Sequence, residues 1–488
     1  MENEQNLSSE IDIRKDKIEK LKEMGEIPYF SKFNRTHKIA ELSADMVGQA
    51  VCVCGRIVFR RIMGKLSFMQ IADVEGKVQV SVGRNEIDEE QYTFFKKMID
   101  IGDFVGIEGE VYLTHTGELT IRAKSVKLLS KTMRPLPEKF HGLIDIEAKY
   151  RQRYLDLISS EETRKVILGR SKVLSFIRKF LGENGFLEVE TPILQSAVCG
   201  ASAKPFITKH NALNKECNLR IAPEVYLKQV IAGGFDRVFE VAKCFRNEGM
   251  DPQHLQEFTM VEWYAAYWDF EDNIAFFTKF IREMFLNVVG TTKGTYNGIE
   301  FDVGEDFDRI NYTEEINKIL GFNVLDYPTL PEFLAKVEET KMFAKDEFDG
   351  IKTVGGVIDY IYKRKIRVNI SKPTILYNYP ACLVPLARRN DKDNRLIDMF
   401  QVLVCGMEIC KAYSELVDPI VQRKALEEQA LAKLNGDDEA MDLDEDFLLA
   451  MEHGMPPISG LGFGVDRLMT ILFGQESLRD VVLFPLMK

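Results

Sequence analysis

The chain has 488 residues, of which 45% are hydrophobic and 29% are charged, and it contains 32 Phe and 16 Tyr. This apolar and aromatic content excludes an intrinsically disordered chain, and the length predicts roughly two to four domains. The 64 basic and 76 acidic side chains give a net charge of −12. A globally basic protein is thereby excluded, so a nucleic-acid partner would be bound by local basic patches.

Cysteine usage and hydropathy indicate the compartment in which the protein works. The eight cysteines form no CxxC pair and no cluster with histidine, so the sequence predicts no structural zinc site. The N-terminal residues lack the basic and apolar regions of a secretory signal. No run of about 18 apolar residues, the length that spans a membrane, occurs in the sequence. We therefore expect a cytoplasmic protein with no membrane partner.

Residues 1–48 are expected to form a helical N-terminal extension. The pattern at residues 9–24 predicts an amphipathic helix with Ser9 as its N-cap, and Gly25 follows its end. The helix carries a set of basic residues, Arg14, Lys15, Lys17, Lys20 and Lys22. Two interpretations stay open for this set, a solvated helix face or a surface that contacts phosphates.

Residues 49–130 change to a period of two, which is typical of strands half buried against a core. The pattern predicts strands at residues 51–60, 66–73, 77–82, 103–113 and 118–129. A helical segment at 89–99 separates the third strand from the fourth, a layout typical of an OB-fold barrel. Such barrels often bind oligonucleotides. Suitable basic and aromatic side chains are Arg56, Arg60, Arg61, Lys65 and Phe68. The alternative for Phe68 is a core position.

A change of composition separates this barrel from the rest of the chain. Residues 131–148 contain two prolines and mixed charges, and we interpret them as a linker. The remaining residues, 149–488, mix helical and strand-like segments without a βαβ rhythm. This mixture predicts an α+β domain with an antiparallel sheet.

Three stretches of the second domain indicate chemistry. The first, residues 185–194, follows an amphipathic helix at about 163–182 and predicts an edge strand that ends at Thr191-Pro192. The third, residues 458–474, has glycines at every second position and then Arg467 where a helix begins. Glycines allow close approach of a ligand to the backbone, but this spacing is not that of a dinucleotide site or a P-loop.

The second stretch, residues 237–267, predicts two strands that flank a polar loop. A period of two places Arg246 on one face with Glu240, and it places four residues of the returning strand together, Phe258, Met260, Glu262 and Tyr264. Arginine offers a positive fork to phosphate oxygens, and an aromatic ring stacks on adenine. From the residues alone, an ATP site and a merely structural Arg–Glu pair explain this hairpin about equally well.

Taken in order, the three stretches resemble motifs 1, 2 and 3 of the class II aminoacyl-tRNA synthetases. A barrel ahead of such a domain is similar to subclass IIb. Three further stretches resemble the bacterial type of lysyl-tRNA synthetases, LRIAPEVYLKQVIAGGFDRVFEVAKCFRNEG (219–249), KAYSELVDPIVQR (411–423) and MPPISGLGFGVDRL (455–468). The resemblance implies an N-terminal OB-fold β-barrel, then a class II catalytic domain whose central antiparallel sheet is flanked by helices. It also implies an insertion at about 290–395.

The resemblance implies that the chain joins L-lysine to tRNA(Lys) by way of lysyl-adenylate, with release of pyrophosphate from ATP. The implied lysine-binding residues are Glu224, Glu262, Tyr264, Tyr413 and Glu415. Three carboxylates suit a substrate with two ammonium groups and repel an aspartate side chain. We expect Glu415 to bind the ε-ammonium and Glu224 the α-ammonium.

The family pattern also implies residues for ATP and its metal ions. The implied ATP-binding residues are Arg246, Glu248, His254, Phe258, Glu408, Gly462 and Arg467. Arg246 on the α-phosphate and Arg467 on the γ-phosphate are the expected catalytic residues, while Phe258 stacks on adenine. Two or three Mg²⁺ ions are expected with ATP, bound through Glu408 and Glu415.

Two further properties follow from the resemblance. Phe68, Gln79 and Glu118 match barrel positions that read the anticodon, because splayed bases are stacked on aromatic rings and hydrogen-bonded at their edges. The chain is expected to form a homodimer across the first motif, at Pro192.

Several positions depart from the family pattern. Gln401 replaces a glutamate that helps to bind metal, which leaves one Mg²⁺ position open, and Lys411 and Val417 replace asparagines. The loop before His254 lacks an arginine that many relatives carry. We therefore predict slower or differently Mg²⁺-dependent activation. Alternatives are an aspartyl- or asparaginyl-tRNA synthetase, a paralogue that lysylates a protein, and a non-catalytic tRNA-binding protein that keeps the fold.

Overall fold

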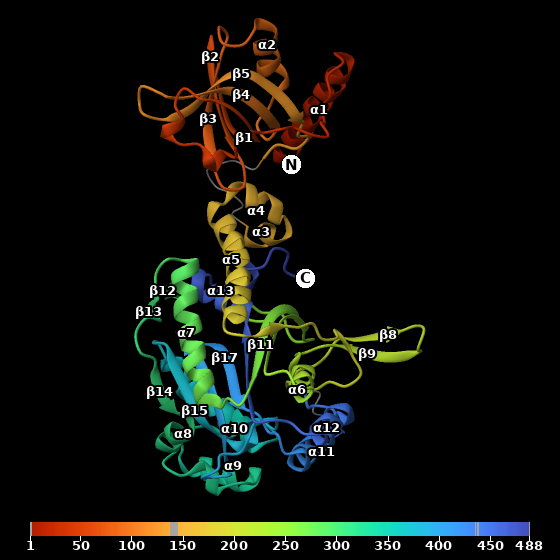
Figure 1. Ribbon diagram of the computed structural model, residues 1–488, viewed down its shortest axis with the longest axis vertical. Coiled ribbons are helices and arrows are strands. Elements are labelled where there is room, and N and C mark those ends of the chain that lie inside the picture. The colour runs from red at the N-terminus through yellow and green to blue at the C-terminus, as the bar shows by residue number, and fades with distance from the viewer. Residues whose placement is uncertain (1, 137–144, 435, 437–438, 488) are drawn as a thin grey trace. The chain divides into compact units, whose positions relative to one another are not determined.

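The computed structural model describes residues 2–136, 145–434, 436 and 439–487. The chain divides into two compact units, Met1–Arg164 and Lys165–Lys488 (Figure 1). Part of the expected linker, residues 137–144, lies outside the described residues. Among those described, no helix has both the length and the apolar character needed to cross a membrane.

The first unit contains a closed barrel with the strand order β1-β2-β3-β5-β4. Its strands are β1 (Ala50–Met63), β2 (Leu66–Ala72), β3 (Lys77–Gly83), β4 (Phe104–Leu113) and β5 (Leu119–Ser130), and α2 (Glu89–Met98) follows β3. Alternate residues face inward, so that Val53, Met69 and Val80 are fully buried. The expected OB-fold is confirmed, with helix and strands close to their predicted bounds.

The N-terminal helix, α1 (Glu2–Glu23), begins seven residues before the predicted cap at Ser9. Two of its basic residues do not face solvent as the sequence suggested. Arg14 is buried and donates to the carbonyl oxygen of Ile101 at 3.1 Å, and Lys17 pairs with Asp100 at 2.7 Å. Within this unit these cations therefore fasten the helix to the barrel. The other helices of the unit are η1 (Ile39–Glu41), η2 (Ala44–Met46), α3 (Ile146–Arg151) and α4 (Arg153–Ser159).

An eight-stranded sheet forms the second unit, in the order β14-β15-β16-β17-β18-β11-β10-β6. Its strands are β6 (Leu187–Glu188), β10 (Arg237–Phe245), β11 (Glu257–Ala266), β14 (Asp308–Asn311), β15 (Thr374–Pro380), β16 (Leu396–Val404), β17 (Met407–Ser414) and β18 (Ile458–Gly464). The expected antiparallel pairing holds for the six central strands. The pairs at both edges are parallel, because long connections, with helices in them, return the chain in the same direction.

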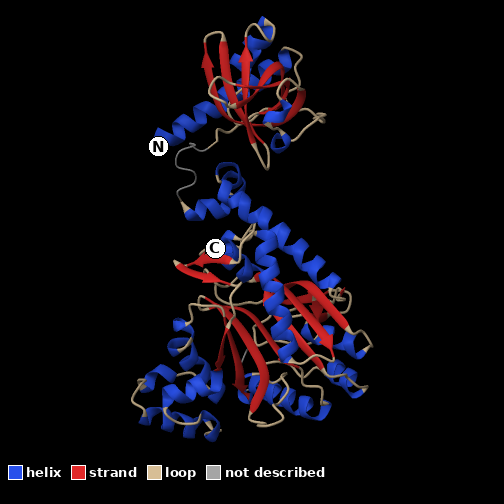
Figure 2. Ribbon diagram, turned by 60° about the vertical axis from the view of Figure 1, so that its left-hand side comes forward, coloured by secondary structure: helices blue, strands red, loops and turns tan. Residues whose placement is uncertain are grey.

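Two layers of helices cover this sheet (Figure 2). One face is covered by α5 (Glu161–Glu183), α7 (Phe270–Val288) and α13 (Val465–Phe473), which share one apolar core with the sheet. The opposite face, near β15 and β16, packs on α8 (Tyr312–Leu320), α9 (Leu330–Glu339), α10 (Val354–Lys365) and α12 (Glu445–Glu452). Alternation along β11 sends Val261 and Trp263 into the first core, so Glu262 and Tyr264 emerge on the opposite face.

Two expectations about this unit differ from the structure. Residues 185–194 form no continuous strand, but only β6 and the start of β7 (Leu194–Gln195), which joins β8 (Ile207–His210) and β9 (Lys215–Leu219) in a small sheet. The segment 290–395, expected as an insertion, supplies β14 and β15 to the main sheet. It also contains the hairpin of β12 (Lys293–Tyr296) and β13 (Ile299–Asp302). Two of its strands are therefore integral to the main sheet of the second unit.

The remaining elements connect these parts. They are α6 (Glu224–Ala232), α11 (Pro419–Leu434) and the short helices η3 (Val324–Asp326), η4 (Lys345–Phe348), η5 (Arg367–Asn369), η6 (Ala381–Leu383) and η7 (Leu478–Asp480).

Candidate active site

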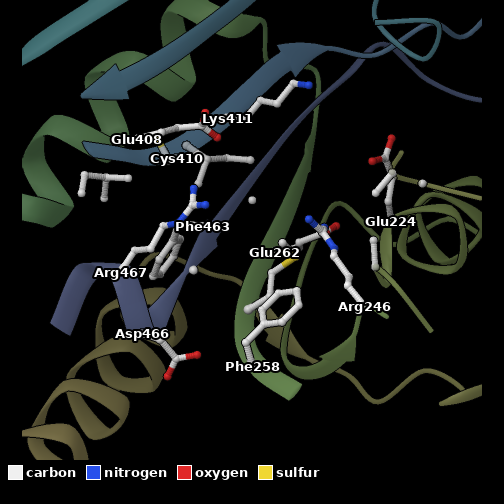
Figure 3. Close-up of a pocket in the computed structure, with 18 of the residues that line it drawn as sticks. Glu224, Arg246, Phe258, Glu262, Glu408, Cys410, Lys411, Phe463, Asp466 and Arg467 are labelled. Atoms are coloured by element: carbon white, nitrogen blue, oxygen red, sulfur yellow. The ribbon is translucent and has the colours of Figure 1, made fainter. Parts of the chain in front are cut away.

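A cavity of about 340 Å³ opens on the face of the sheet opposite to α5, α7 and α13 (Figure 3). Residues of β11, β17 and β18, the first residue of α6, the first turn of α13 and the loop between β10 and β11 contribute to its lining. All of the residues predicted for ATP and lysine lie in this lining, namely Glu224, Arg246, Glu248, His254, Phe258, Glu262, Tyr264, Glu408, Tyr413, Glu415, Gly462 and Arg467. Residues spread over more than 240 positions of sequence are thus brought to one cavity.

Strand periodicity places the acidic side chains. Glu262 pairs with Gly462 across β11 and β18, and Tyr264 pairs with Gly460. A methyl group at position 460 would overlap the ring of Tyr264 and the carboxylate of Glu415. The alternate glycines of β18 therefore leave the room that these larger side chains occupy.

The part of the cavity formed by Glu224, Glu262, Tyr264, Tyr413 and Glu415 is here called the acidic end. The Tyr413 hydroxyl donates to Glu224 Oε1 at 2.7 Å, and the Tyr264 hydroxyl donates to Glu262 Oε2 at 3.0 Å. Burial, followed by the nearby Glu224 carboxylate, raises the pKa of Glu262 to about 8. Glu262 is therefore mainly protonated at neutral pH.

Lys228, which the sequence analysis did not single out, lies behind the acidic end. Its ammonium is fully buried, donates to Glu224 Oε1 at 2.7 Å and forms an ion pair with Glu415. Burial by itself would lower the pKa of Lys228, but the carboxylates of Glu224 and Glu415 outweigh burial and raise it. The spacing of four residues from Glu224 on a helix was the available sequence signal.

Arg246 and Phe258 lie at the other end of the cavity, on both sides of the loop between β10 and β11. The Arg246 guanidinium carbon is 5.1 Å from the centroid of the Phe258 ring. The loop is closed by a hydrogen bond from the Arg246 amide to the carbonyl of Gln256 at 2.9 Å. The Gln256 side chain also donates to the Gly249 carbonyl at 3.0 Å. This loop therefore holds its shape by hydrogen bonds of its own.

The structural interpretation of this hairpin required an ion pair between Glu240 and Arg246. The two residues do not form this pair. Glu240 instead forms a buried ion pair with Arg220 at 2.6 Å and accepts a hydrogen bond from the Thr191 hydroxyl at 2.7 Å. Among the described residues, the guanidinium of Arg246 forms two long hydrogen bonds of 3.4 Å to the Ile221 carbonyl and no ion pair. This guanidinium is thus directed to the cavity, as the ATP-site interpretation predicts.

Arg467 lies in the first turn of α13, and its neighbour Asp466 fixes that turn. Asp466 accepts hydrogen bonds from the Thr259 amide at 2.9 Å and from Arg170 at 2.6 Å. Figure 3 shows Arg246 and Arg467 reaching into the cavity from opposite sides. Two fixed cations that face one cavity are suited to a polyphosphate.

His254 and Glu248 belong to the rim formed by the loop. The His254 side chain is 44% exposed, and its Nδ1 lies 2.7 Å from a carboxylate oxygen of Asp251. Burial would raise the pKa of Asp251, yet the hydrogen bonds from His254 and Gln253 lower it. Glu248 is half-buried in the cavity lining.

The predicted metal ligands are only partly compatible with their surroundings. Glu408 lines the cavity and accepts a hydrogen bond from the Gln401 amide at 2.9 Å, while Gln401 Oε1 accepts from the Tyr379 hydroxyl at 2.7 Å. No group of three or more His, Cys, Asp or Glu that could hold a metal ion occurs in the described parts of the chain. A single carboxylate with substrate phosphates is nevertheless a usual Mg²⁺ environment, so Glu408 fits such an ion.

Glu415 does not fit the shared metal site that we expected. Seven residues of extended chain separate it from Glu408, which corresponds to roughly 23 Å at about 3.3 Å per residue. Its carboxylate also faces Lys228. One ion therefore cannot be bound by both residues, and the contact with Lys228 favours Glu415 as part of the acidic end.

The two other substituted positions differ in their surroundings. Lys411 lines the cavity, and we find no ion pair for it among the described residues. Burial lowers the pKa of Lys411, while Glu408 acts in the opposite direction. Val417 packs against an apolar cluster that includes Leu227. Lys411 therefore changes the charge of the cavity, whereas Val417 contributes to packing.

The three predicted anticodon residues lie on adjacent strands of the barrel. Phe68 is half-buried and is not part of the barrel core, because its neighbours Ser67 and Met69 point inward. Gln79 lies on the next strand and donates to the Thr120 hydroxyl at 2.9 Å. Glu118 is exposed directly before β5. The core alternative for Phe68 is therefore wrong.

Two of the basic residues expected on this surface have structural partners instead. The Arg60 guanidinium donates to the carbonyl oxygens of Phe95 and Lys96 at the end of α2, at 2.7 and 2.8 Å. The Arg56 guanidinium lies 4.2 Å from the centroid of the Phe104 ring. Arg61 and Lys65 are exposed, so they are the basic residues of this set that remain accessible.

Pro192 lies outside the cavity on an exposed turn. The two residues that follow are also exposed, Ile193 by 42% and Leu194 by 50%. This turn presents contiguous apolar surface within the second unit.

The chain was compared with known protein families. Residues 145–488 match the model of the class II tRNA synthetases (D, K and N), and residues 51–129 match that of the OB-fold nucleic acid binding domain. The chain therefore belongs to the class II tRNA synthetases of the D, K and N group.

Three similar proteins within this group are named lysine–tRNA ligase. The protein of Enterococcus faecalis is 40% identical over 494 residues, covering 99% of this chain and 98% of the relative. That of Lactococcus lactis subsp. cremoris is 42% identical over 492 residues, covering 99% of both. The protein of Cronobacter sakazakii is 42% identical over 497 residues, covering 99% of this chain and 97% of the relative.

Proposed function

We propose that this chain is a lysine–tRNA ligase, which activates L-lysine with ATP to lysyl-adenylate and transfers the lysine to the 3′ end of tRNA(Lys). The observation that carries the proposal is the single cavity with three carboxylates at one end and Arg246 and Arg467 at the other. The relatives over the full chain bear the same activity in their names.

The acidic end supports lysine over aspartate or asparagine as the amino acid. Glu224, Glu262 and Glu415 all line it. Lys228, the buried cation behind them, is already paired with two carboxylates. An aspartate side chain would meet net negative charge there, at a cost in binding free energy. We assign Glu415 to the ε-ammonium and Glu224 to the α-ammonium of the substrate.

Activation requires positioning more than proton transfer. The lysine carboxylate is already ionised and attacks the α-phosphorus, so no general base is needed. Arg246 is proposed to hold the α-phosphate and Arg467 the γ-phosphate, from opposite sides of the cavity. Phe258 would stack on adenine beneath Arg246, Gly462 would leave space for the nucleotide, and Glu248 and His254 complete the rim.

Mg²⁺ would neutralise phosphate charge when it is bound with ATP. We propose Glu408 as its protein ligand. The side chain of Gln401 forms hydrogen bonds with Tyr379 and Glu408, and it adds no negative charge that would bind a further ion. Lys411 supplies a cation to the same cavity. These two positions support fewer protein-bound ions than the two or three that the family pattern implies.

The remaining partners are proposed from the barrel and the exposed turn. Phe68, Gln79 and Glu118 form a surface suited to the anticodon of tRNA(Lys). The apolar turn at Pro192 is suited to a second copy of the chain, which supports a homodimer. The eight cysteines are free thiols, in keeping with work in the reducing cytoplasm.

The decisive experiment is ATP–pyrophosphate exchange with each of the 20 amino acids in turn, followed by charging of a tRNA(Lys) transcript. Exchange with lysine alone, and charging of that transcript, are expected. Exchange with aspartate or asparagine would contradict the proposed substrate. Absence of any exchange, with tRNA binding retained, would favour the non-catalytic binding protein. Exchange without tRNA charging would favour a paralogue that lysylates a protein.

A further inference from the structure

We propose that Lys228 is a positioning residue for lysine recognition, whose buried ammonium orients Glu224 and Glu415 and sets the charge of the acidic end to match the two substrate ammonium groups. This inference rests on the proposed function and concerns a residue that does not itself touch the substrate. Lys228 is absent from the cavity lining and has no exposed surface.

The contacts of Lys228 connect two separate elements behind the cavity. Glu224 is the first residue of α6, and Glu415 follows the end of β17. The ammonium donates to Glu224 at 2.7 Å and pairs with Glu415. Because Tyr413 also donates to Glu224 at 2.7 Å, the Glu224 carboxylate is held by two donors. Its orientation is therefore fixed before any ligand arrives.

Aromatic side chains enclose the ammonium on its other sides. Lys228 Nζ lies 5.6 Å from the centroid of the Tyr413 ring and 5.8 Å from that of Phe447, which belongs to α12. A lysine in such surroundings is desolvated, so it stays charged only because two carboxylates face it. The titratable groups that face it from the other elements are Glu415 and Tyr413, with Cys199 and Glu262 also within electrostatic reach.

The charges of the acidic end agree with this role. Once lysine has displaced the proton of Glu262, three carboxylates and the Lys228 ammonium leave two net negative charges, which balance the two lysine ammonium groups. Without Lys228, three carboxylates would share one desolvated site. Buried carboxylates in such proximity do not all ionise at neutral pH. At least one of Glu224 and Glu415 would then be protonated until lysine displaced the proton.

The test compares Lys228→Met with the wild-type full-length chain. Met has a similar length and no charge. We expect the KM for lysine in pyrophosphate exchange at pH 7 to rise roughly 30-fold or more, which corresponds to loss of a charged hydrogen bond. The KM for ATP should change by less than about threefold, because Lys228 lies behind the acidic end.

A count of protons separates this role from a merely structural one. Calorimetry in buffers of different ionisation enthalpy gives the protons released on lysine binding. The Met variant should release about one proton more per lysine than the wild type. A folded Met variant with unchanged lysine KM and unchanged proton release would overturn the proposal.

Lys228→Arg is the matched conservative variant and decides the question if the Met variant does not fold. Arginine keeps the positive charge and can donate to both carboxylates. We expect the lysine KM of this variant within about fivefold of wild type, with the wild-type proton count. If Lys228→Arg folds but its KM for lysine rises as much as the rise expected for Lys228→Met, the proposal is also overturned. If the wild type itself shows no lysine-dependent exchange, the proposed function is wrong, and the inference about Lys228 falls with it.

Discussion

At the scale of single residues, burial changes the chemistry of the acidic end more than the sequence indicates. Glu262 was expected to act as one of three ordinary carboxylates. In the structure it is buried beside Glu224, and its pKa is raised to about 8. A carboxyl group with this pKa is roughly 90% protonated at pH 7. Lysine binding must therefore displace a proton from it.

This residue predicts a pH dependence of lysine binding. A raised pKa means that Glu262 becomes negatively charged only as pH rises towards 8, while the lysine ammonium groups are still protonated. The KM for lysine should fall by about tenfold between pH 6.5 and 8.5, measured by pyrophosphate exchange. Glu262→Gln, which cannot ionise, should bind lysine more weakly and lose this dependence. A flat profile for the wild type would contradict the assignment.

Gln401 gives a second prediction at this scale. Its amide donates to Glu408 at 2.9 Å, so Gln401→Glu would place two carboxylates side by side next to the phosphate region of the cavity. Such a pair recruits a divalent cation, and the exchange rate should depend more steeply on Mg²⁺ concentration. Tyr379→Phe removes only the hydroxyl that Gln401 Oε1 accepts and should leave the steepness unchanged. If Gln401→Glu and the wild type depend equally on Mg²⁺, Gln401 does not weaken metal binding at this cavity.

At the scale of elements, β18 determines the shape of the acidic end. Gly460→Ala would place a methyl group against Tyr264 and Glu415. We expect the KM for lysine to rise by roughly tenfold or more, because both side chains must move. The matched control is Gly462→Ala on the same strand, where the nearest atom, Glu262 Cγ, lies at 3.4 Å. The lysine KM should rise less in this control, and the reverse order would contradict the role of β18.

The packing of α5 on α13 gives another prediction at this scale. An alanine at Gly169 of α5 would overlap the ring of Phe473, the last residue of α13, whereas nothing lies within 4 Å of the same position at Gly182. Gly169→Ala should lower the free energy of unfolding by about 1–3 kcal/mol through overpacking. Gly182→Ala should raise it by about 0.5–1 kcal/mol through helix propensity. Urea denaturation of both variants measures the difference, and equal effects would contradict this packing.

At the scale of the whole molecule, the cavity and the barrel belong to different compact units. All of the cavity lining lies between residues 200 and 478, within the second unit. A fragment of residues 145–488, the extent of the family match, should therefore retain lysine-dependent exchange within about fivefold. Charging of tRNA(Lys) should fall roughly a hundredfold or more without the barrel. A folded fragment without exchange would contradict this division.

A point variant of the full-length chain serves as the control for the fragment. Phe68→Ala should reduce tRNA charging and leave exchange unchanged, because Phe68 lies on the barrel surface and outside the cavity. Loss of exchange in this variant would mean that the barrel contributes to activation.

The sequence by itself determined the elements whose pattern is local. A period of two predicted the barrel strands and placed Phe258, Glu262 and Tyr264 on one face of β11. The sequence also placed Arg467 where a helix begins, and α13 begins at Val465. Side-chain alternation and helix periodicity depend on near neighbours in the chain, so they can be read without tertiary information.

Only the tertiary structure decided which charges meet. Arg14 was expected on an exposed helix face and Arg60 on a nucleic-acid-binding surface, but both donate hydrogen bonds that hold helices against the barrel. The sequence did not indicate a role for Lys228. Its burial depends on tertiary packing, and its second partner, Glu415, is 187 positions away in the sequence. The ionisation of Glu262 and the neutral pairing of Gln401 likewise depend on residues brought together by the sheet. Charges act through space and burial, and neither is encoded in local spacing.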